Sequence, residues 1–225
     1  RAAAVITVGD GVARALRAAY GWDHVHVVRN TFPLLEAADA PPLPPTPAGA
    51  LYAGRLAPYR ELETIAAASR ELDLPITMVG PADETWLASF DPGRATIEPA
   101  RPVQEVDRML AAAGLALVTH SDRWANHRLA MPNKLFHAVR MGVPVVATDV
   151  GELSALVREH GVGELYRPGD PAALAAAVRR AVTHYPDLCD AVRAAAPALS
   201  WESDAAALRQ VYERVGRTAQ PATLS

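Results

Sequence analysis

The sequence contains a single cysteine, Cys189, among 225 residues, which excludes a disulfide framework and a cysteine-rich metal site. No apolar run approaches the ~20 residues that a membrane-spanning helix needs. The start of the chain lacks both a methionine and the pattern of a secretory signal peptide, and we interpret it as a fragment boundary or a processed start. The formal net charge is −3, so no general affinity for nucleic acid is expected. These absences favour a cytoplasmic globular protein with one sizeable core.

Several motifs of well-known chemistries are also missing. The sequence has no Gly-x-x-x-x-Gly-Lys-Ser/Thr phosphate loop, no Gly-x-Gly-x-x-Gly after a strand and no Gly-x-Ser-x-Gly elbow. It has no Asp-x-Asp pair, and His120, His127 and His137 are too loosely spaced for a zinc site. We therefore expect no metal and no cofactor, and nucleotide hydrolysis and dinucleotide redox chemistry lose support.

Lysine is almost absent as well. Of the 22 cationic residues only Lys134 is a lysine, and the others are arginines. Together with the abundant alanine, this indicates a GC-rich coding bias. A lysine retained against that bias suggests a role for a compact point charge that arginine cannot copy.

What the chain does contain is a regular alternation of short apolar runs and helical patterns. Strands are predicted over residues 4–8, 24–28, 50–54, 75–80, 95–99, 115–120, 144–148 and 164–168. Helices are predicted over residues 10–20, 60–72, 103–113, 133–141, 152–160, 171–184, 187–197 and 202–217, with a short helix or turn over 82–90 and a polar loop over 121–131. Strands alternating with helices predict an α/β fold with a doubly wound, Rossmann-like parallel sheet. Five prolines between residues 41 and 47 indicate a stiff linker over 33–49.

In such folds ligands bind at the carboxyl ends of the strands. There, Gly54 ends a predicted strand, Arg55 follows it, and Arg60 opens the next helix. Two guanidinium groups at one strand end could hold a diphosphate, because their forked geometry matches phosphate oxygens. The alternative, that both are ordinary surface residues of an arginine-rich protein, stays open at this point.

A second candidate region begins at Pro132, which stands where a first helical turn would begin. The free amides of that turn, at Asn133 and beyond, present a positive dipole end, and Lys134 lies in the same turn. His137 follows three residues later on the same helix face. It is either a ligand contact or a packed, hydrogen-bonded core histidine.

At this point the motifs together resemble a known family. The segments LYAGRLAPYRELETI, PITMVG, PNKLFHAVRMGVPVVATDVGE, GVGELYRPGDPAALAAAVRRAV and LSWESDAAALRQVYERV are similar, in order and spacing, to motifs of the glycosyl transferases group 1. The chain is thereby identified as the C-terminal, donor-binding half of a GT-B-fold glycosyltransferase of the family 4 type. Arg55 matches the family's diphosphate-binding arginine, and Arg60 takes the place of its lysine.

The resemblance implies a division of the chain into four parts. Residues 1–32 would be the end of an N-terminal acceptor domain and the crossover, 33–49 the linker, 50–200 the nucleotide-sugar-binding domain, and 201–225 a helix that crosses back toward the missing N-terminal domain. The implied activity is transfer of a sugar from a nucleoside diphosphate donor, with retention of configuration and without a metal. The chain alone is expected to fold and bind nucleotide weakly without transferring sugar.

The resemblance also implies roles for particular residues. Arg55, Arg60 and Lys134 would be catalytic, since they would stabilise the leaving diphosphate. The donor would be bound by Gly54, Pro99, Arg101, Pro132, Asn133, His137, Asp149, Gly151 and Glu152, with the base near Pro99–Arg101 and the sugar or ribose near 149–152.

Two positions depart from the family pattern. Its paired glutamates would fall at Leu129 and His137, eight residues apart. A subgroup that lacks the first glutamate shares Pro132, Lys134 and Phe136 with this chain. The exchange at His137 puts the ribose contact in doubt.

The expected partners are the nucleotide sugar and the missing acceptor domain, through which peripheral membrane association stays open, but no nucleic acid. Two other functions also stay open. One is a nucleotide-sugar 2-epimerase of the same fold, and the other is a non-catalytic domain that binds a nucleotide sugar or a partner. The sugar, the base and the acceptor are not determined by the sequence.

Overall fold

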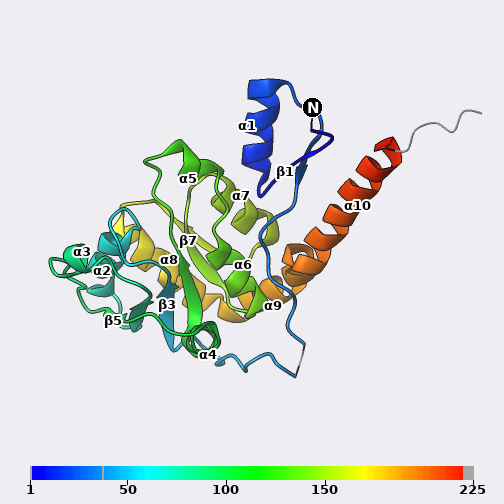
Figure 1. The fold of residues 1–225 in the computed structure, drawn as a ribbon. Coiled ribbons are helices and arrows are strands. Elements are labelled where there is room, and N and C mark those ends of the chain that lie inside the picture. The colour runs from blue at the N-terminus through cyan, green and yellow to red at the C-terminus, as the bar shows by residue number, and fades with distance from the viewer. Residues whose placement is uncertain (1, 37, 220–225) are drawn as a thin grey trace, which may run out of the picture.

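A six-stranded parallel sheet forms the centre of the molecule in the computed structural model, which describes residues 2–36 and 38–219 (Figure 1). Its strand order is β5-β4-β3-β6-β7-β8, and every neighbouring pair is parallel. The strands are β3 (Gly49–Ala53), β4 (Ile76–Val79), β5 (Thr96–Glu98), β6 (Gly114–Val118), β7 (Val145–Thr148) and β8 (Gly163–Tyr166). The predicted α/β, Rossmann-like class is confirmed.

The strand order reverses at one place. The chain runs outward from β3 through β4 to β5, then returns to place β6 on the other side of β3. The loops that follow β3 and β6 therefore diverge, and a crevice at the carboxyl ends of these two strands is the favoured ligand position in such sheets.

Helices cover both faces of the sheet. The helices are α1 (Asp10–Tyr20), α2 (Leu62–Ser69), α3 (Glu84–Leu87), α4 (Val103–Ala113), α5 (Ala125–Leu129), α6 (Asn133–Arg140), α7 (Gly151–His160), α8 (Pro171–Thr183), α9 (Tyr185–Ala195) and α10 (Trp201–Ala219), with a 3-10 turn over Ala196–Leu199. Side chains of α2 and α8 pack with Tyr52 on one face, whereas α4, α6 and α7 pack with Leu51 on the other. Because successive strand residues point to opposite faces, β3 contributes to both halves of the core.

The prediction of a loop over residues 121–131 is wrong in part, because α5 lies within this segment. Five residues without an apolar stripe give no helical signal in the sequence. The helix packs instead against Gly151 at the start of α7, where a side chain would place its Cβ 1.9 Å from the carbonyl oxygen of Arg128. Tertiary packing against a bare backbone therefore accounts for α5.

The N-terminal residues form a separate small unit. Strands β1 (Val5–Thr7) and β2 (Val25–Val27) make a two-stranded parallel sheet beside α1, apart from the main sheet (Figure 1). Helix α1 matches its predicted range and contacts α5 and α7.

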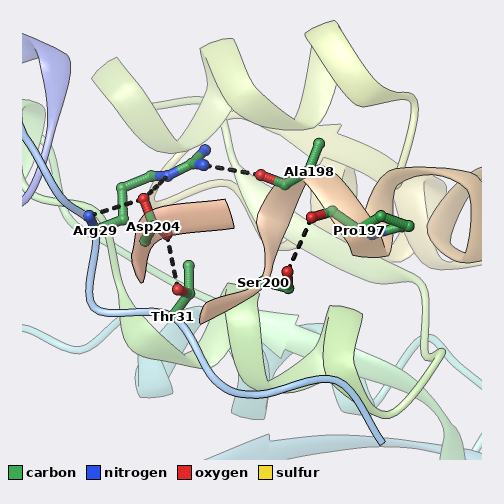
Figure 2. Close-up of polar contacts among 6 residues, drawn as sticks. All are labelled: Arg29, Thr31, Pro197, Ala198, Ser200 and Asp204. Atoms are coloured by element: carbon green, nitrogen blue, oxygen red, sulfur yellow. Dashed lines mark hydrogen bonds and ion pairs between the residues drawn. The ribbon is translucent and has the colours of Figure 1, made fainter. Parts of the chain in front are cut away.

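The segment that follows β2 is hydrogen-bonded to the start of α10, far away in the sequence (Figure 2). Asp204 of α10 is only 4% exposed and accepts hydrogen bonds from the backbone amide of Arg29, 3.2 Å, and the hydroxyl of Thr31, 2.7 Å. The guanidinium of Arg29 also donates to Asp204, 3.2 Å, and to the carbonyl of Ala198, 2.8 Å. The start of α10 is thus tied to the segment that leaves β2.

Beyond this anchor, α10 extends away from the sheet (Figure 1). Tyr212 on this helix is 68% exposed, whereas Val211 is buried. None of the described helices combines the length and apolarity that crossing a membrane requires.

Candidate functional site

Lys134 reaches from the first turn of α6 to the end of β3, at the reversal point of the sheet. Its ammonium donates a hydrogen bond to the hydroxyl of Tyr52, 3.1 Å, and lies 4.2 Å from the centre of that ring. A Cβ at Gly54 would lie 2.5 Å from Cε of Lys134. The bare backbone of Gly54 is therefore what admits the lysine.

The environment of Lys134 is poor in water and lacks a compensating negative charge among its described contacts. Burial lowers the pKa of Lys134 to about 7, and the nearby Arg60 guanidinium lowers it further in the same direction. An anion that entered here would favour the charged ammonium and raise this pKa. The arrangement can therefore accept a negatively charged group beside the ammonium.

Arg60 belongs to the same cluster. Its carbonyl accepts a hydrogen bond from the hydroxyl of Thr119, which follows β6, at 2.7 Å. Burial raises the pKa of Tyr52 to about 12, and the Arg60 charge opposes that rise. Arg60 therefore acts on both Lys134 and Tyr52, which places its charge at the junction of β3 and β6.

The backbone around Arg60 is strained. Tyr59 and Glu61, on either side of it, have φ values of 65° and 62°, in the left-handed region that non-glycine residues avoid. Thr64 and the amide of Gly169 both donate to the Glu61 carboxylate, at 3.0 and 2.7 Å, and hold this conformation. Such strain costs on the order of 1–3 kcal/mol per residue and is concentrated at functional sites.

His120 completes the cluster, although the sequence suggested it only as a rejected zinc ligand. Its Nδ1 lies 3.2 Å from the carbonyl oxygen of His127, so this nitrogen must carry the proton. Burial lowers the pKa of His120 to about 4, and the charges of Lys134 and Arg60 contribute. The ring is neutral at pH 7, and its Nε2 is a hydrogen-bond acceptor.

The other predicted phosphate-binding residues lie around this cluster. The carbonyl of Arg55 accepts a hydrogen bond from the hydroxyl of Tyr52 at 3.1 Å, and Arg55 is an exposed residue. Pro132 is the N-cap of α6, and Asn133 begins the helix at the surface. The amide-rich start of α6 and the Lys134 ammonium thus belong to one turn.

His137 faces a different neighbour from the one expected. Its Nε2 bonds the carboxylate of Asp107 on α4, and its ring lies 5.5 Å from that of Phe32. It also lines, with Lys134, a narrow pocket of about 20 Å³. The ring is thus packed and hydrogen-bonded to a side-chain carboxylate, which agrees with the packed alternative, and spacing along the sequence gives no signal for Asp107.

The remaining predicted residues lie at two other strand ends. Beyond β5, Pro99 is exposed and Arg101 forms ion pairs with Glu98 at 2.8 Å and Glu105 at 3.3 Å. The structure thus places the residues predicted near the base at the edge strand of the sheet, with β4 between them and β3.

Beyond β7, each carboxylate has an arginine partner. Asp149 pairs with Arg158 at 2.5 Å, and Glu152 pairs with Arg14 of α1. A Cβ at Gly11 would lie 2.8 Å from the Glu152 carboxylate, so this side chain contacts the N-terminal unit closely. Among the residues that the structure describes, no group of three or more His, Cys, Asp or Glu side chains is arranged to hold a metal ion.

The six-stranded, Rossmann-like parallel sheet with flanking helices matches the fold of GT-B glycosyltransferases of known structure. The model of the glycosyl transferases group 1 matches residues 48–184, more than half of the chain, and the chain belongs to this family.

Solved structures of similar fold include sucrose-phosphate synthase from Thermosynechococcus elongatus, with a TM-score of 0.77 and 22% identity over 97% of this chain. AviGT4, a glycosyltransferase of avilamycin A biosynthesis, gives a TM-score of 0.70 and 26% identity over 92% of this chain. The Anabaena protein HepE, solved with UDP and glucose, gives a TM-score of 0.73 and 17% identity over 96% of this chain. The chain spans 60%, 62% and 64% of these three proteins, respectively. None of the curated protein sequences compared with the chain matches it.

Proposed function

We propose that this chain is the donor-binding part of a glycosyltransferase that takes a sugar from a nucleoside diphosphate donor. The observation that carries the proposal is the cluster of Lys134, Arg60 and the start of α6 at the reversal point of the sheet. HepE was solved with UDP and glucose, and TarM with UDP. Their fold similarity supports a nucleoside diphosphate as the ligand.

The cluster suits the chemical step of such a transfer. As the bond between the sugar carbon and the diphosphate oxygen breaks, its electron pair stays on the diphosphate and negative charge grows there. Lys134 and Arg60 would stabilise that charge, with Arg55 contributing from the rim, in a site where fixed charges need little rearrangement. The oxygen of the acceptor hydroxyl forms the new bond to the sugar carbon, and its proton passes to the leaving diphosphate oxygen. We further propose that configuration is retained and that these side chains do the work of a metal.

The rest of the donor would extend along the strand ends. The base would bind near Pro99 and Arg101, and the ribose near the paired His137 and Asp107. The sugar would lie toward Asp149, Gly151 and Glu152. Since the chain spans about 60% of its relatives, the acceptor would be held by an additional N-terminal domain in a cytoplasmic protein. The comparisons lend no support to a 2-epimerase or to a non-catalytic domain.

A titration tests the proposal directly. UDP, GDP and ADP would each be titrated by calorimetry into the chain and into the Lys134→Ala and Arg60→Ala variants. We expect at least one nucleotide to bind, and each variant to weaken it by about tenfold or more, since hydrogen bonds to charged groups are lost. Arg209→Ala, on α10, is the matched loss of one positive charge outside the cluster. Equal affinity in all proteins would disprove the assignment.

A further inference from the structure

Two aromatic side chains stand at the surface beside the cationic cluster. Tyr59 is 52% exposed and Trp124 is 45% exposed, and their ring centres lie 5.1 Å apart in an edge-to-face arrangement. The first follows β3 and the second follows β6, so the pair spans the two loops that diverge at the reversal point. Large rings left exposed at a strand-end crevice are costly in water, and ligand contact would compensate for that cost.

Tyr59 also borders a pocket with polar walls. A cavity of about 290 Å³ is lined by Tyr59, Glu61, Thr64, Ser121 and Arg123, together with Pro58 and Glu63. This volume is near the lower limit of small-ligand pockets, about 300 Å³, and suits one ring rather than an extended molecule. Carboxylates, hydroxyls and a guanidinium around an aromatic wall provide both donors and acceptors for a ligand rich in hydroxyl groups.

The pocket is built rather than incidental. Tyr59 is held with φ at 65°, a conformation that a tyrosine adopts only when its surroundings impose it. The Arg123 guanidinium lies 5.1 Å from the centre of the Tyr59 ring, which orients both side chains. The Glu61 carboxylate is fixed by the amide of Gly169 at 2.7 Å. Arg60, whose charge acts on Lys134, lies between Tyr59 and Glu61 in the chain.

We propose that Tyr59, with Trp124 packed edge-to-face against it, forms an aromatic platform for a pyranose ring, with the Glu61 carboxylate and the Arg123 guanidinium binding the hydroxyl groups of that ring. The apolar C–H face of a sugar ring packs on an aromatic face, while its equatorial hydroxyls need polar partners at the rim. The platform lies beyond β3 and β6, apart from the residues after β7 assigned to the donor sugar, and a donor ring bound on it would revise that assignment. This inference rests on the proposed function for the identity of the reaction, but not for the binding of a sugar ring.

The experiment compares wild type, Tyr59→Ala, Trp124→Ala and Tyr59→Phe by calorimetry. In one arm the ligands are UDP, GDP, ADP and their glucose conjugates, which report a ring supplied by the donor. In the other arm the ligands are methyl glucoside and maltose without nucleotide, which report a ring supplied by the acceptor. We expect both alanine variants to lose about three- to tenfold in affinity for the sugar-bearing ligand of one arm. Nucleoside diphosphate affinity should stay unchanged, and Tyr59→Phe should retain binding because the ring remains.

Tyr212→Ala removes a more exposed aromatic ring, 68% exposed, from α10 and serves as the control, with no change expected. Alanine variants that bind every saccharide and nucleotide sugar as wild type does would overturn the platform. A platform that binds sugar in a chain with no affinity for any nucleoside diphosphate would refute the proposed function alone. The two failures are therefore separable.

Discussion

The ammonium of Lys134 donates to the hydroxyl of Tyr52 at 3.1 Å and lies over the same ring, 4.2 Å from its centre. A helix start and a strand end are thereby joined at the reversal point of the sheet. The only lysine in the sequence is thus held where burial and the Arg60 charge lower its pKa to about 7.

The first prediction concerns pH. Burial and the Arg60 charge lower the pKa of Lys134 to about 7, below the ordinary value of 10.5. As the pH rises through 7 the unliganded chain loses this positive charge, so anion affinity should fall between about pH 6 and pH 8.5. Nucleoside diphosphate titrations across this range should show the fall in wild type. Lys134→Arg keeps its charge, and a fall of the same size in that variant would contradict the assignment.

The second prediction concerns Gly54→Ala. The added Cβ would lie 2.5 Å from Cε of Lys134, so the lysine must move from the cleft. We expect nucleoside diphosphate affinity to fall by about tenfold because the ammonium is displaced. The thermal midpoint should fall as well, because the φ of 158° at Gly54 is strained for a residue with a Cβ. Gly216→Ala on α10 has open space around it and should leave binding unchanged. Normal binding by Gly54→Ala would show that the position of Lys134 is unimportant.

The third prediction concerns the anchor of α10. Asp204 is buried and accepts three hydrogen bonds from Arg29 and Thr31. Asp204→Ala leaves these donors without a partner and should lower the free energy of unfolding by about 3 kcal/mol, measured by urea denaturation. Asp190→Ala breaks the exposed pair with Arg193 and should cost about 0–1 kcal/mol. Similar costs for both variants would argue against a structural role for the anchor.

The fourth prediction concerns His137 and Asp107, which are bonded to each other. If they bind the ribose as a unit, His137→Ala and Asp107→Ala should weaken nucleotide binding by similar factors, and the double variant should be little worse than either. His137→Glu alone should weaken nucleotide binding, because two adjacent carboxylates repel each other. The double variant His137→Glu, Asp107→Asn removes one of these charges and should bind nucleotide more tightly than His137→Glu alone. Purely additive losses in a double-mutant cycle would show that the residues act separately.

The fifth prediction concerns turnover. Sugar transfer requires donor and acceptor to be held in register, and this chain spans about 60% of its relatives. We expect the 225-residue chain to bind nucleotide but to release no detectable glycosylated product in a radiolabelled donor assay. Transfer by the chain alone would overturn the division of labour proposed here.

The predictable part of this protein is the part governed by local pattern. Helix α1 matches its predicted range because apolar side chains recur every three or four residues from Val12 to Ala19. The buried strands β6 and β7 were equally clear, since continuous apolar runs are typical of a parallel sheet covered on both faces. Gly54, Arg60 and Lys134 stood out as well, because they follow strand ends or open helices.

Other features depended on residues that meet only in three dimensions. Helix α5 forms where its backbone packs on Gly151, and its five residues carry no period long enough to predict it. Asp107 is bonded to His137, thirty positions away in the sequence, and Tyr52 is bonded to Lys134, eighty-two positions away. The sequence by itself determined which elements form, because hydrophobic periodicity is local. Only the tertiary structure decided which polar groups face each other, because the strand order places distant segments side by side.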